Sequence, residues 1–295
     1  MKVAFIGLGT MGLRMARQLV GAGHEVVACD TDPARAAALG VATAATPAEA
    51  VAGADVALAS LPSVAVVEQV FLGKGGLREG ARSGTVLVDM STSAPTLARR
   101  IHQECLADGI PFLDAPVSGG PTGADAATLT IMVGGAADSF ERCRPLLELM
   151  GSLVRHVGGP GTGQAAKLCN NLMAGCNMVA LAESCAIAQR EGIDPAVFYE
   201  LVTSSTGDSK VLRNRFPLAG VSDRHPASTE WSPMFMLDLI VKDLELAREL
   251  AAAHGLTAEM TSAALTQYRA GQQAGLGALD YSAVYVVKQP DARPR

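Results

Sequence analysis

The sequence predicts an α/β protein in which a doubly wound parallel sheet precedes an all-helical domain, with a long helix joining the two. Short apolar runs alternate with helical patterns through the first half of the chain, which is typical of such a sheet. A glycine-rich stretch separates the first apolar run from the first helical pattern. The second half contains helical patterns and no further nucleotide motif. These three observations carry the fold prediction.

Composition limits the partners that the protein can have. The chain has 295 residues, which corresponds to roughly two domains of about 100–200 residues each. Its net charge is −5 and no block of lysine or arginine forms a stripe, so we expect no nucleic-acid partner and no membrane surface. The most apolar stretch, Leu172 to Ala188, is interrupted by polar residues and is shorter than the roughly 20 residues that a bilayer needs. We interpret it as a buried helix.

The cysteines and histidines show no metal or disulfide pattern. The six cysteines include no C-x-x-C pair, and we interpret them as reduced core residues of a cytoplasmic protein. The five histidines are scattered without an H-x-x-x-H pair, so we predict no metal site. The N-terminus starts with a strand pattern rather than a signal peptide, which agrees with a cytoplasmic location.

The glycine-rich stretch reads Gly7-Leu8-Gly9-Thr10-Met11-Gly12 and connects a strand at Lys2–Ile6 to a helix that ends near Gly21. A second strand follows at Glu25–Cys29. In this context the glycines predict a dinucleotide site: Gly7 allows a tight turn, Gly9 admits the pyrophosphate, and Gly12 lets helix and strand pack closely. The helix N-terminus offers N–H groups to the phosphates. The alternative is a structural glycine turn.

Asp30 predicts which dinucleotide is bound. It lies 18 residues after Gly12, at the end of the second strand. A carboxylate there accepts hydrogen bonds from the adenosine ribose and repels a 2′-phosphate, so we predict NAD. Arg35 lies close enough in sequence to leave NADP as an alternative. Asp30 also starts the turn Asp30-Thr31-Asp32-Pro33, which is its purely structural interpretation.

Further strands and helices alternate up to residue 157. We predict strands at Asp55–Ser60, Thr85–Asp89, Phe112–Asp114, Leu129–Val133 and Leu153–Val157, and helices at Pro47–Ala52, Val64–Phe71, Ala94–Leu106 (with Ser93 as its cap) and Ser139–Met150. Ligands of such sheets bind at the carboxyl ends of the strands. We therefore assign Leu61-Pro62 and Ser91-Thr92 to the nicotinamide half of the cofactor, where Thr92 can hydrogen-bond the ribose. Ordinary strand-end turns are the alternative.

A second glycine-rich loop follows the strand at Phe112–Asp114. The stretch from Ala115 to Ala124 contains Ser118-Gly119-Gly120 and exposes several backbone N–H groups beside one hydroxyl. Such an arrangement suits a carboxylate. We predict that this loop holds an anionic substrate.

Gly158-Gly159-Pro160-Gly161 ends the alternation, and we place the domain boundary there, with domains at 1–161 and 162–295. The helix that follows carries Lys167, with Asn170 and Asn171 three and four residues later on the same face. An ammonium and amides on one face can hold a small anionic or hydroxylated molecule. The alternative is a solvated lysine with polar neighbours.

Four motifs in this order resemble the β-hydroxyacid dehydrogenase family, which includes 3-hydroxyisobutyrate dehydrogenase and tartronate semialdehyde reductase. They are Gly7-x-Gly9-x-x-Gly12, Asp89-Met90-Ser91-Thr92, Asp114-Ala115-Pro116-Val117-Ser118-Gly119-Gly120 and Gly161-x-Gly163-x-x-x-Lys167-x-x-Asn170-Asn171. The resemblance covers nearly the whole chain. It implies a Rossmann-type first domain and an all-helical second domain joined by the Lys167 helix. One departure is Ala127, which precedes Thr128-Leu129 where the family usually has a glycine.

The resemblance also implies roles for individual residues. Lys167 is then the catalytic residue, Ser118-Gly119-Gly120 and Asn171 bind the substrate, and Leu61-Pro62 and Thr92 contact the cofactor. Lys242, in a Lys-Asp-Leu motif, is implied to reach the cofactor, and Phe235 to line the substrate pocket; a solvated helix face and a core position are the alternatives. Asp280-Tyr281-Ser282 also fits the family, without an assigned role.

The second half is predicted to be helical, with helices at Gln164–Arg190, Pro195–Val202, Phe235–His254 and Thr257–Ala270. We expect an irregular connection at Gly220–Ser232 and a disordered tail at Pro290–Arg295. A helical, apolar domain of this kind often pairs with another copy, so we expect a homodimer or homotetramer.

We therefore predict an NAD-dependent 3-hydroxyacid dehydrogenase of the 3-hydroxyisobutyrate type, acting on a small anionic substrate. A lysine can take the hydroxyl proton when burial and a nearby cationic nicotinamide favour its neutral form. Two alternatives remain: a reductase of an aldehyde acid such as tartronate, succinate or a sulfonated semialdehyde, and a non-catalytic dinucleotide-binding scaffold. An imine reductase is disfavoured, because those relatives generally lack a lysine at the position of Lys167.

Overall fold

The computed structural model describes residues 1–292 and divides the chain into two compact units, Met1–Lys167 and Leu168–Arg295. The first unit is α/β and the second is helical, so the predicted fold class is confirmed. The first six residues of the long helix, Thr162 to Lys167, group with the first unit. The predicted division after Gly161 stays a prediction.

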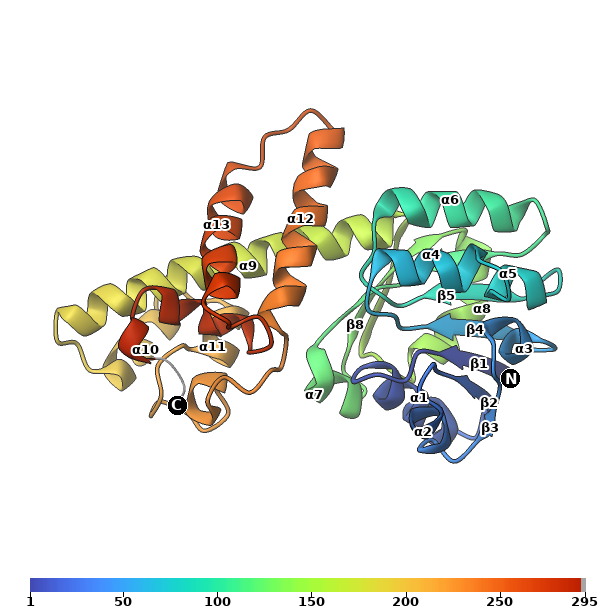
Figure 1. Ribbon diagram of the computed structural model, residues 1–295, viewed down its shortest axis with the longest axis horizontal. Coiled ribbons are helices and arrows are strands. Elements are labelled where there is room, and N and C mark those ends of the chain that lie inside the picture. The colour runs from blue at the N-terminus through green and yellow to red at the C-terminus, as the bar shows by residue number, and fades with distance from the viewer. Residues whose placement is uncertain (293–295) are drawn as a thin grey trace. The chain divides into compact units, whose positions relative to one another are not determined.

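The first unit is built on one sheet of nine strands (Figure 1). The strands are β1 (Lys2–Ile6), β2 (Glu25–Cys29), β3 (Ala42–Thr43), β4 (Val56–Ala59), β5 (Val86–Asp89), β6 (Phe112–Asp114), β7 (Val117–Ser118), β8 (Thr130–Gly135) and β9 (Leu153–Gly158). They lie in the order β3-β2-β1-β4-β5-β6-β8-β7, and β9 pairs with β8. The helices are α1 (Gly12–Gly21), α2 (Pro33–Ala37), α3 (Pro47–Val51), α4 (Val64–Leu72), α5 (Leu77–Gly80), α6 (Pro95–Leu106), α7 (Gly120–Asp125) and α8 (Ala137–Leu147).

The sheet is parallel from β3 to β6, as predicted, but β8 runs antiparallel to both β6 and β7. The predicted parallel sheet is therefore confirmed from β3 to β6, whereas the antiparallel pairing of β8 was not predicted. Only residues 119–129 separate β7 from β8, and a parallel crossover needs about a dozen residues or more. This segment forms the short helix α7 and then turns back at Ala127, which has a φ of 54°. The predicted open loop at 115–124 is thus a strand and a helix.

Alternating side chains give the sheet a core on each face. In β1, Val3 and Phe5 belong to one buried cluster, whereas Ala4 and Ile6 belong to another. Helices α4 and α6 cover one face and α1 and α2 the other (Figure 1). Helices cover both faces of the sheet. The loops that follow β1, β4 and β5 therefore meet at the carboxyl ends of these neighbouring strands.

The second unit is organised around the helix α9 (Thr162–Arg190), whose residues from Leu168 onward belong to it. The other helices are α10 (Pro195–Thr203), α11 (Lys210–Arg215), α12 (Leu237–Ala253), α13 (Glu259–Gln273) and the 3₁₀ segments η1 (Pro226–Thr229), η2 (Tyr281–Val287) and η3 (Pro290–Ala292). Met178 and Cys185 of α9 pack with Leu244 of α12 and Tyr268 of α13 in one buried cluster. Of the predicted tail, Pro290–Ala292 forms η3 and the remainder lies outside the described residues.

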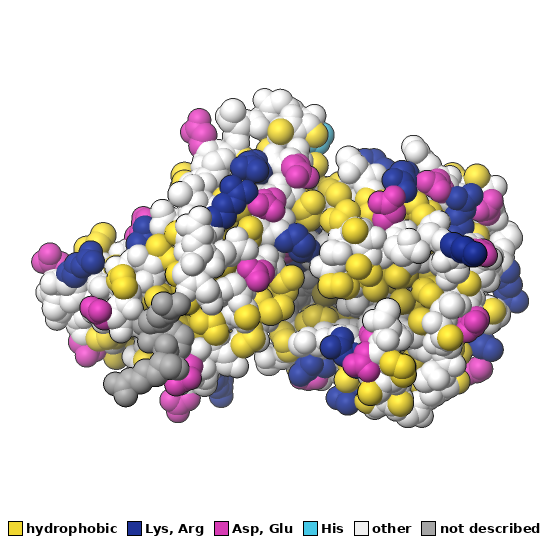
Figure 2. All heavy atoms as spheres, in the orientation of Figure 1, with side chains coloured by type: hydrophobic (Ala, Val, Ile, Leu, Met, Phe, Trp, Pro, Cys, Tyr) yellow, Lys and Arg dark blue, Asp and Glu magenta, His cyan; other side chains and the backbone are white. Residues whose placement is uncertain are grey.

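Helix α9 is long and apolar enough to cross a membrane by length and composition alone. Half of its most apolar window is buried within the structure, and core helices of soluble proteins pass the same test. The test is therefore weak evidence for a membrane span. On the face drawn in Figure 2, acidic and basic side chains are interspersed.

All six cysteines are free, but they are not all core residues. Four are buried, and burial raises the pKa of the Cys143 and Cys185 thiols to about 12. Cys169 is exposed on α9, so its interpretation as a core residue was wrong. Its neighbours Leu168 and Asn171 are buried, which turns Cys169 to the opposite face of the helix.

Candidate active site

The glycine loop between β1 and α1 has the shape that its sequence predicts. Gly7 adopts a φ of 84°, and a Cβ there would lie 2.4 Å from the Ser60 carbonyl oxygen. A Cβ on Gly12 would lie 1.9 Å from the Gly7 carbonyl oxygen. At Gly9, by contrast, the nearest atom to a Cβ is Arg35 Nη1 at 4.0 Å. The fold itself therefore requires glycine at 7 and 12, whereas glycine at 9 keeps the loop surface open for a ligand, as a bound pyrophosphate requires.

Asp30 lies against this loop. Its Oδ2 accepts a hydrogen bond from the Leu8 backbone N–H at 2.6 Å, and its Oδ1 accepts one from the Asp32 N–H at 2.8 Å. A carboxylate has about four acceptor positions, so both oxygens retain capacity for ribose hydroxyls. Arg35 forms an ion pair with Asp32, with its Nε 3.4 Å from Asp32 Oδ2. The remaining loop residues, Thr10 and Met11, lead into α1, whose N-terminus has no side-chain cap.

The two loops assigned to the nicotinamide half are joined to each other. Leu61 follows the end of β4 and Ser91 follows β5, and the Leu61 N–H donates to Ser91 Oγ at 2.9 Å. Pro62 is exposed and Thr92 half-buried at this edge of the sheet. Ser93 does not cap α6, because Ala94 is the residue at that position and no side-chain bond is made there. The Ser93 backbone N–H instead donates to Gln164 Oε1 at 2.9 Å.

Ser118 ends β7, and Gly119 and Gly120 begin α7 with φ values of 140° and 63°. Ser118 pairs with Thr130 of β8, which fixes its backbone at the end of the sheet. Gly119 is exposed. The segment is a strand end and a helix start rather than the predicted loop, and its role in binding an anion stays a prediction.

Lys167 lies one turn and a half into α9 and is 7% exposed. Asp114, at the end of β6, holds the start of this helix: its Oδ1 accepts from the Gly161 N–H and its Oδ2 from the Gln164 N–H, each at 2.8 Å. A carboxylate at a helix N-terminus satisfies free donors and interacts favourably with the dipole. Burial raises the pKa of the Asp114 carboxyl, and the N–H groups of Gln164 and Gly161 oppose that rise.

Asn171 of the second unit is buried, at 5% exposure, and its amide is held at both ends. Its Nδ2 donates to Asp243 Oδ2 at 2.5 Å, and its Oδ1 accepts from Asn170 Nδ2 at 3.0 Å. Asp243 is 1% exposed and its Oδ1 pairs with Lys242 Nζ at 3.1 Å. A solvated helix face is therefore excluded for Asp243. The amide of Asn171 still has one N–H and one lone pair for a ligand.

Phe235 is half-buried and precedes α12 rather than belonging to it. Its N–H donates to Asp280 Oδ2 at 3.0 Å, and its ring meets that of Tyr281 edge-on at 5.9 Å between centroids. Asp280 is fully buried and also pairs with Arg215 Nε at 3.4 Å. The Asp280-Tyr281-Ser282 motif thus fixes the backbone that presents Phe235.

Three supporting residues were not predicted as site residues from the sequence: Asp114, Gln164 and Asp243. Each is a buried polar residue within one of the family motifs, and buried polar residues need partners. Their partners lie about 50 to 75 residues away in sequence, which no local pattern reveals. Their positions inside the motifs that carry Ser118, Lys167 and Lys242 were the available signal.

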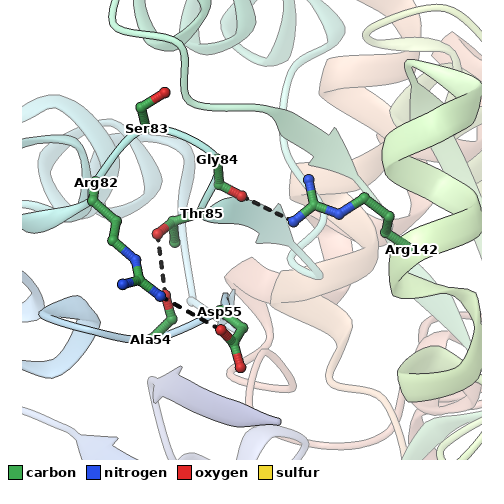
Figure 3. A pocket seen from close by; sticks show the side chains of 7 residues that line it. All are labelled: Ala54, Asp55, Arg82, Ser83, Gly84, Thr85 and Arg142. Carbon is green, nitrogen blue, oxygen red and sulfur yellow. Dashed lines mark hydrogen bonds and ion pairs between the residues drawn. The ribbon is translucent and has the colours of Figure 1, made fainter.

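A cavity of the first unit lies away from these residues. It has a volume of about 310 Å³ and is lined by residues that precede β4 and β5, so it opens at the amino ends of these strands (Figure 3). Arg142 Nη2 donates to the Gly84 carbonyl at 3.0 Å, and Arg82 Nη2 pairs with Asp55 at 3.6 Å. Both arginines are already paired, and the cavity lies at the end of the sheet opposite the cofactor loops. This cavity is therefore not the candidate site. No group of three metal-ligating side chains occurs within residues 1–292.

Known proteins match both units. Residues 2–158 match the family model described as the NAD binding domain of 6-phosphogluconate dehydrogenase. Residues 161–287 match the model described as the NAD-binding of NADP-dependent 3-hydroxyisobutyrate dehydrogenase. The chain is 40% identical over 294 residues to NAD-dependent L-serine dehydrogenase from Pseudomonas aeruginosa, covering 98% of each chain.

Two further relatives show the same likeness. A 3-hydroxyisobutyrate dehydrogenase from Pseudomonas aeruginosa is 40% identical over 268 residues, which is 90% of this chain and 89% of the relative. The solved structure of Mycobacterium tuberculosis 3-hydroxyisobutyrate dehydrogenase with L-serine matches with a TM-score of 0.90 and 40% identity. The match covers 97% of this chain and 98% of that structure.

Proposed function

The chain belongs to the β-hydroxyacid dehydrogenase family, and we propose that it oxidises a small 3-hydroxyacid of the 3-hydroxyisobutyrate type with Lys167 as general acid and base. It is an NAD-dependent oxidoreductase of hydroxyacids. We propose the choice of substrate and the roles of the individual residues.

One observation carries the proposal: Lys167 and Asn171 are both buried on one face of α9, although both are polar. Buried polar side chains need polar partners, and the Asn171 amide has them in Asp243 and Asn170. The exposed neighbours Cys169 and Asn170 show that the same helix turn also has a solvent face. A buried amine one turn from a held amide is the arrangement that proton transfer at a substrate hydroxyl needs.

The reaction divides between the cofactor and the chain. Bound NAD supplies the acceptor for the hydride that leaves the substrate carbon. Lys167 Nζ takes the hydroxyl proton, which requires a neutral amine at the start of the oxidation. In the reverse direction the ammonium returns the proton and stabilises developing negative charge on oxygen.

The remaining predicted residues orient the substrate. The N–H groups of Ser118, Gly119 and Gly120, with the Ser118 hydroxyl, receive the carboxylate. Asn171 uses its remaining N–H for the reacting oxygen or the carboxylate, and its bonds to Asp243 and Asn170 keep that N–H in one direction. Phe235, fixed by Asp280, provides an apolar wall of the pocket.

The names of the relatives guide the substrate test. Relatives at 40% identity act on 3-hydroxyisobutyrate and L-serine, both three-carbon chains with a terminal hydroxyl and a carboxylate. We expect purified protein to reduce NAD with such hydroxyacids, and we expect NADP to be a poorer acceptor. Higher activity in the reducing direction with tartronate, succinate or sulfonated semialdehydes would favour the aldehyde-acid reductase instead.

The role of Lys167 is tested by Lys167→Ala. General acid–base catalysis contributes typically about 10²- to 10⁴-fold, so kcat should fall by that order while calorimetry still detects NAD binding. Lys74→Ala, at an exposed turn of the first unit, is the matched control and should retain full activity. Loss of NAD binding together with activity would contradict a purely catalytic role. NAD binding by the wild type without turnover on any hydroxyacid would instead favour a scaffold.

A further inference from the structure

The side chain of Gln164 is fully buried and bonded at both ends. Its Oε1 accepts a hydrogen bond from the Ser93 backbone N–H at 2.9 Å. Its Nε2 donates to the Ser91 carbonyl oxygen at 2.8 Å and lies 3.4 Å from Asp89 Oδ2. The Gln164 amide therefore hydrogen-bonds two backbone positions, Ser91 and Ser93, of the loop that follows β5.

That loop is itself linked to the loop after β4. Asp89 Oδ1 accepts from the Ser91 N–H at 2.9 Å, and Ser91 Oγ accepts from the Leu61 N–H at 2.9 Å. These are the two loops assigned to the nicotinamide half of the cofactor. A continuous chain of hydrogen bonds thus runs from Leu61 through Ser91 to Gln164, within the first unit.

Gln164 lies three residues before Lys167 on the same helix. Residues at this spacing share a face, and they are separated by only about 4.5 Å along the helix axis. The helix start is also held by Asp114, but that carboxylate bonds to Gly161 and Gln164 and not to the cofactor loops. The Gln164 side chain joins the Lys167 helix directly to the loop after β5 and, through Ser91, to the loop after β4.

We propose that Gln164 is a positioning residue, which sets the place of the Lys167 amine relative to the nicotinamide loops. This rests on the proposed function, because it assumes that Lys167 transfers the proton. A misplacement of about 1 Å can cost on the order of 100-fold in rate, so a side chain that fixes this register affects turnover without touching the substrate.

The test is Gln164→Met, which keeps the volume and removes the amide. The matched control is Gln189→Met on the same helix, where the Gln189 Oε1 accepts from the Tyr285 hydroxyl. We expect Gln164→Met to lower kcat about 10- to 100-fold, and we expect the change in KM for NAD to be smaller than the change in kcat. In hydrogen exchange, the segment around Ser93 should exchange faster, whereas the glycine loop at 7–12 should be unchanged. Gln189→Met should alter neither kcat nor this exchange.

A double-mutant cycle separates positioning from mere packing. If Gln164 acts through Lys167, adding Gln164→Met to Lys167→Ala should reduce kcat little further. Losses that multiply in full, or a wild-type kcat in Gln164→Met, would overturn the proposal. If Gln164→Met does not fold, Gln164→Asn, which withdraws the amide by one methylene, is held to the same criteria.

The same cycle distinguishes the proposed role of Lys167 from that of Gln164. A Lys167→Ala variant with wild-type kcat would remove the proposed role of Lys167 and the inference with it. A severely impaired Lys167→Ala beside a fully active Gln164→Met would overturn only the role of Gln164.

Discussion

At the scale of single residues, Ala127 shows why a departure from a family pattern has a physical cost. It takes a φ of 54°, in the left-handed region that costs a residue with a Cβ about 1–2 kcal/mol. The sequence shows alanine where the family usually has glycine, and the structure shows why glycine is favoured there.

We therefore expect Ala127→Gly to raise the free energy of unfolding by about 0.5–1 kcal/mol, once the greater freedom of glycine in the unfolded chain is deducted. Urea unfolding measures the change. Ala126→Gly is the matched control: Ala126 has a φ of −84°, so the substitution relieves no strain and should lower stability. Equal effects at the two positions would refute strain at Ala127.

Cofactor choice is also decided by single residues. The Asp30 carboxylate lies at the glycine loop, where we expect it to repel the 2′-phosphate of NADP, and Arg35 is paired with Asp32. We expect Asp30→Ser to lower the NAD-to-NADP ratio of kcat/KM by about 10- to 100-fold, or about 1.4–2.8 kcal/mol. Asp32→Ala, which releases Arg35, should change the ratio less. A wild-type enzyme that prefers NADP would contradict the assignment.

Which residues could be predicted depended on the range of their contacts. The roles of Gly7 and Gly12 follow from a motif of six residues, and the structure confirms the close contacts at both. Asp114 and Gln164 act on partners far along the chain, so their burial and bonding required coordinates. The roles of Lys167, Ser118 and Asn171 remain predictions.

At the scale of elements, strands β1, β2, β4, β5 and β6 of the parallel half were predicted within one residue at their ends, because apolar runs bounded by polar or glycine residues define them. The two-residue strand β3 was missed. The reversal of β8 was missed. Periodicity reports which residues are buried but not the direction in which a strand runs. The short helices α2, α5, α7 and α11 were missed as well, because four to six residues carry little helical periodicity, although the five-residue α3 was predicted.

The start of α9 depends on a close approach between elements. A Cβ on Gly163 would lie 2.4 Å from the Met132 carbonyl oxygen and 2.5 Å from that of Asp114. Gly163→Ala must therefore push the helix away from β6 and β8.

We expect Gly163→Ala to lower the free energy of unfolding by about 1–3 kcal/mol, as other overpacking substitutions do. It should also reduce kcat, because Lys167 lies one turn further along the displaced helix. Thermal unfolding and steady-state kinetics measure the two effects. Gly159→Ala, where a Cβ meets nothing within 4 Å, should leave both unchanged. A fully stable and active Gly163→Ala would show that the helix start is not held as described.

At the scale of the whole molecule, the second unit leaves large apolar side chains exposed. On α9, Met173 is 64% and Ile187 is 63% exposed; they lie 14 residues apart, about four turns, and so point to similar sides. Leu201 of α10 and Met260 of α13 are also more than half exposed. A helix whose apolar residues continue beyond its buried face is typical of a protein–protein interface.

We therefore expect the protein to be a homodimer or a homotetramer in solution, with the α9 positions Met173 and Ile187 in the contact. Light scattering after size-exclusion chromatography should give a multiple of 30.3 kDa for the wild type. Met173→Glu combined with Ile187→Glu places charges in a contact that excludes water, which is unfavourable, and should shift the mass towards that of one chain. The control exchanges two exposed apolar residues of the first unit, Leu106→Glu and Leu153→Glu, and should leave the mass unchanged. A wild-type protein that elutes with the mass of one chain at micromolar concentration would contradict the prediction, and so would a double variant that keeps the full oligomeric mass.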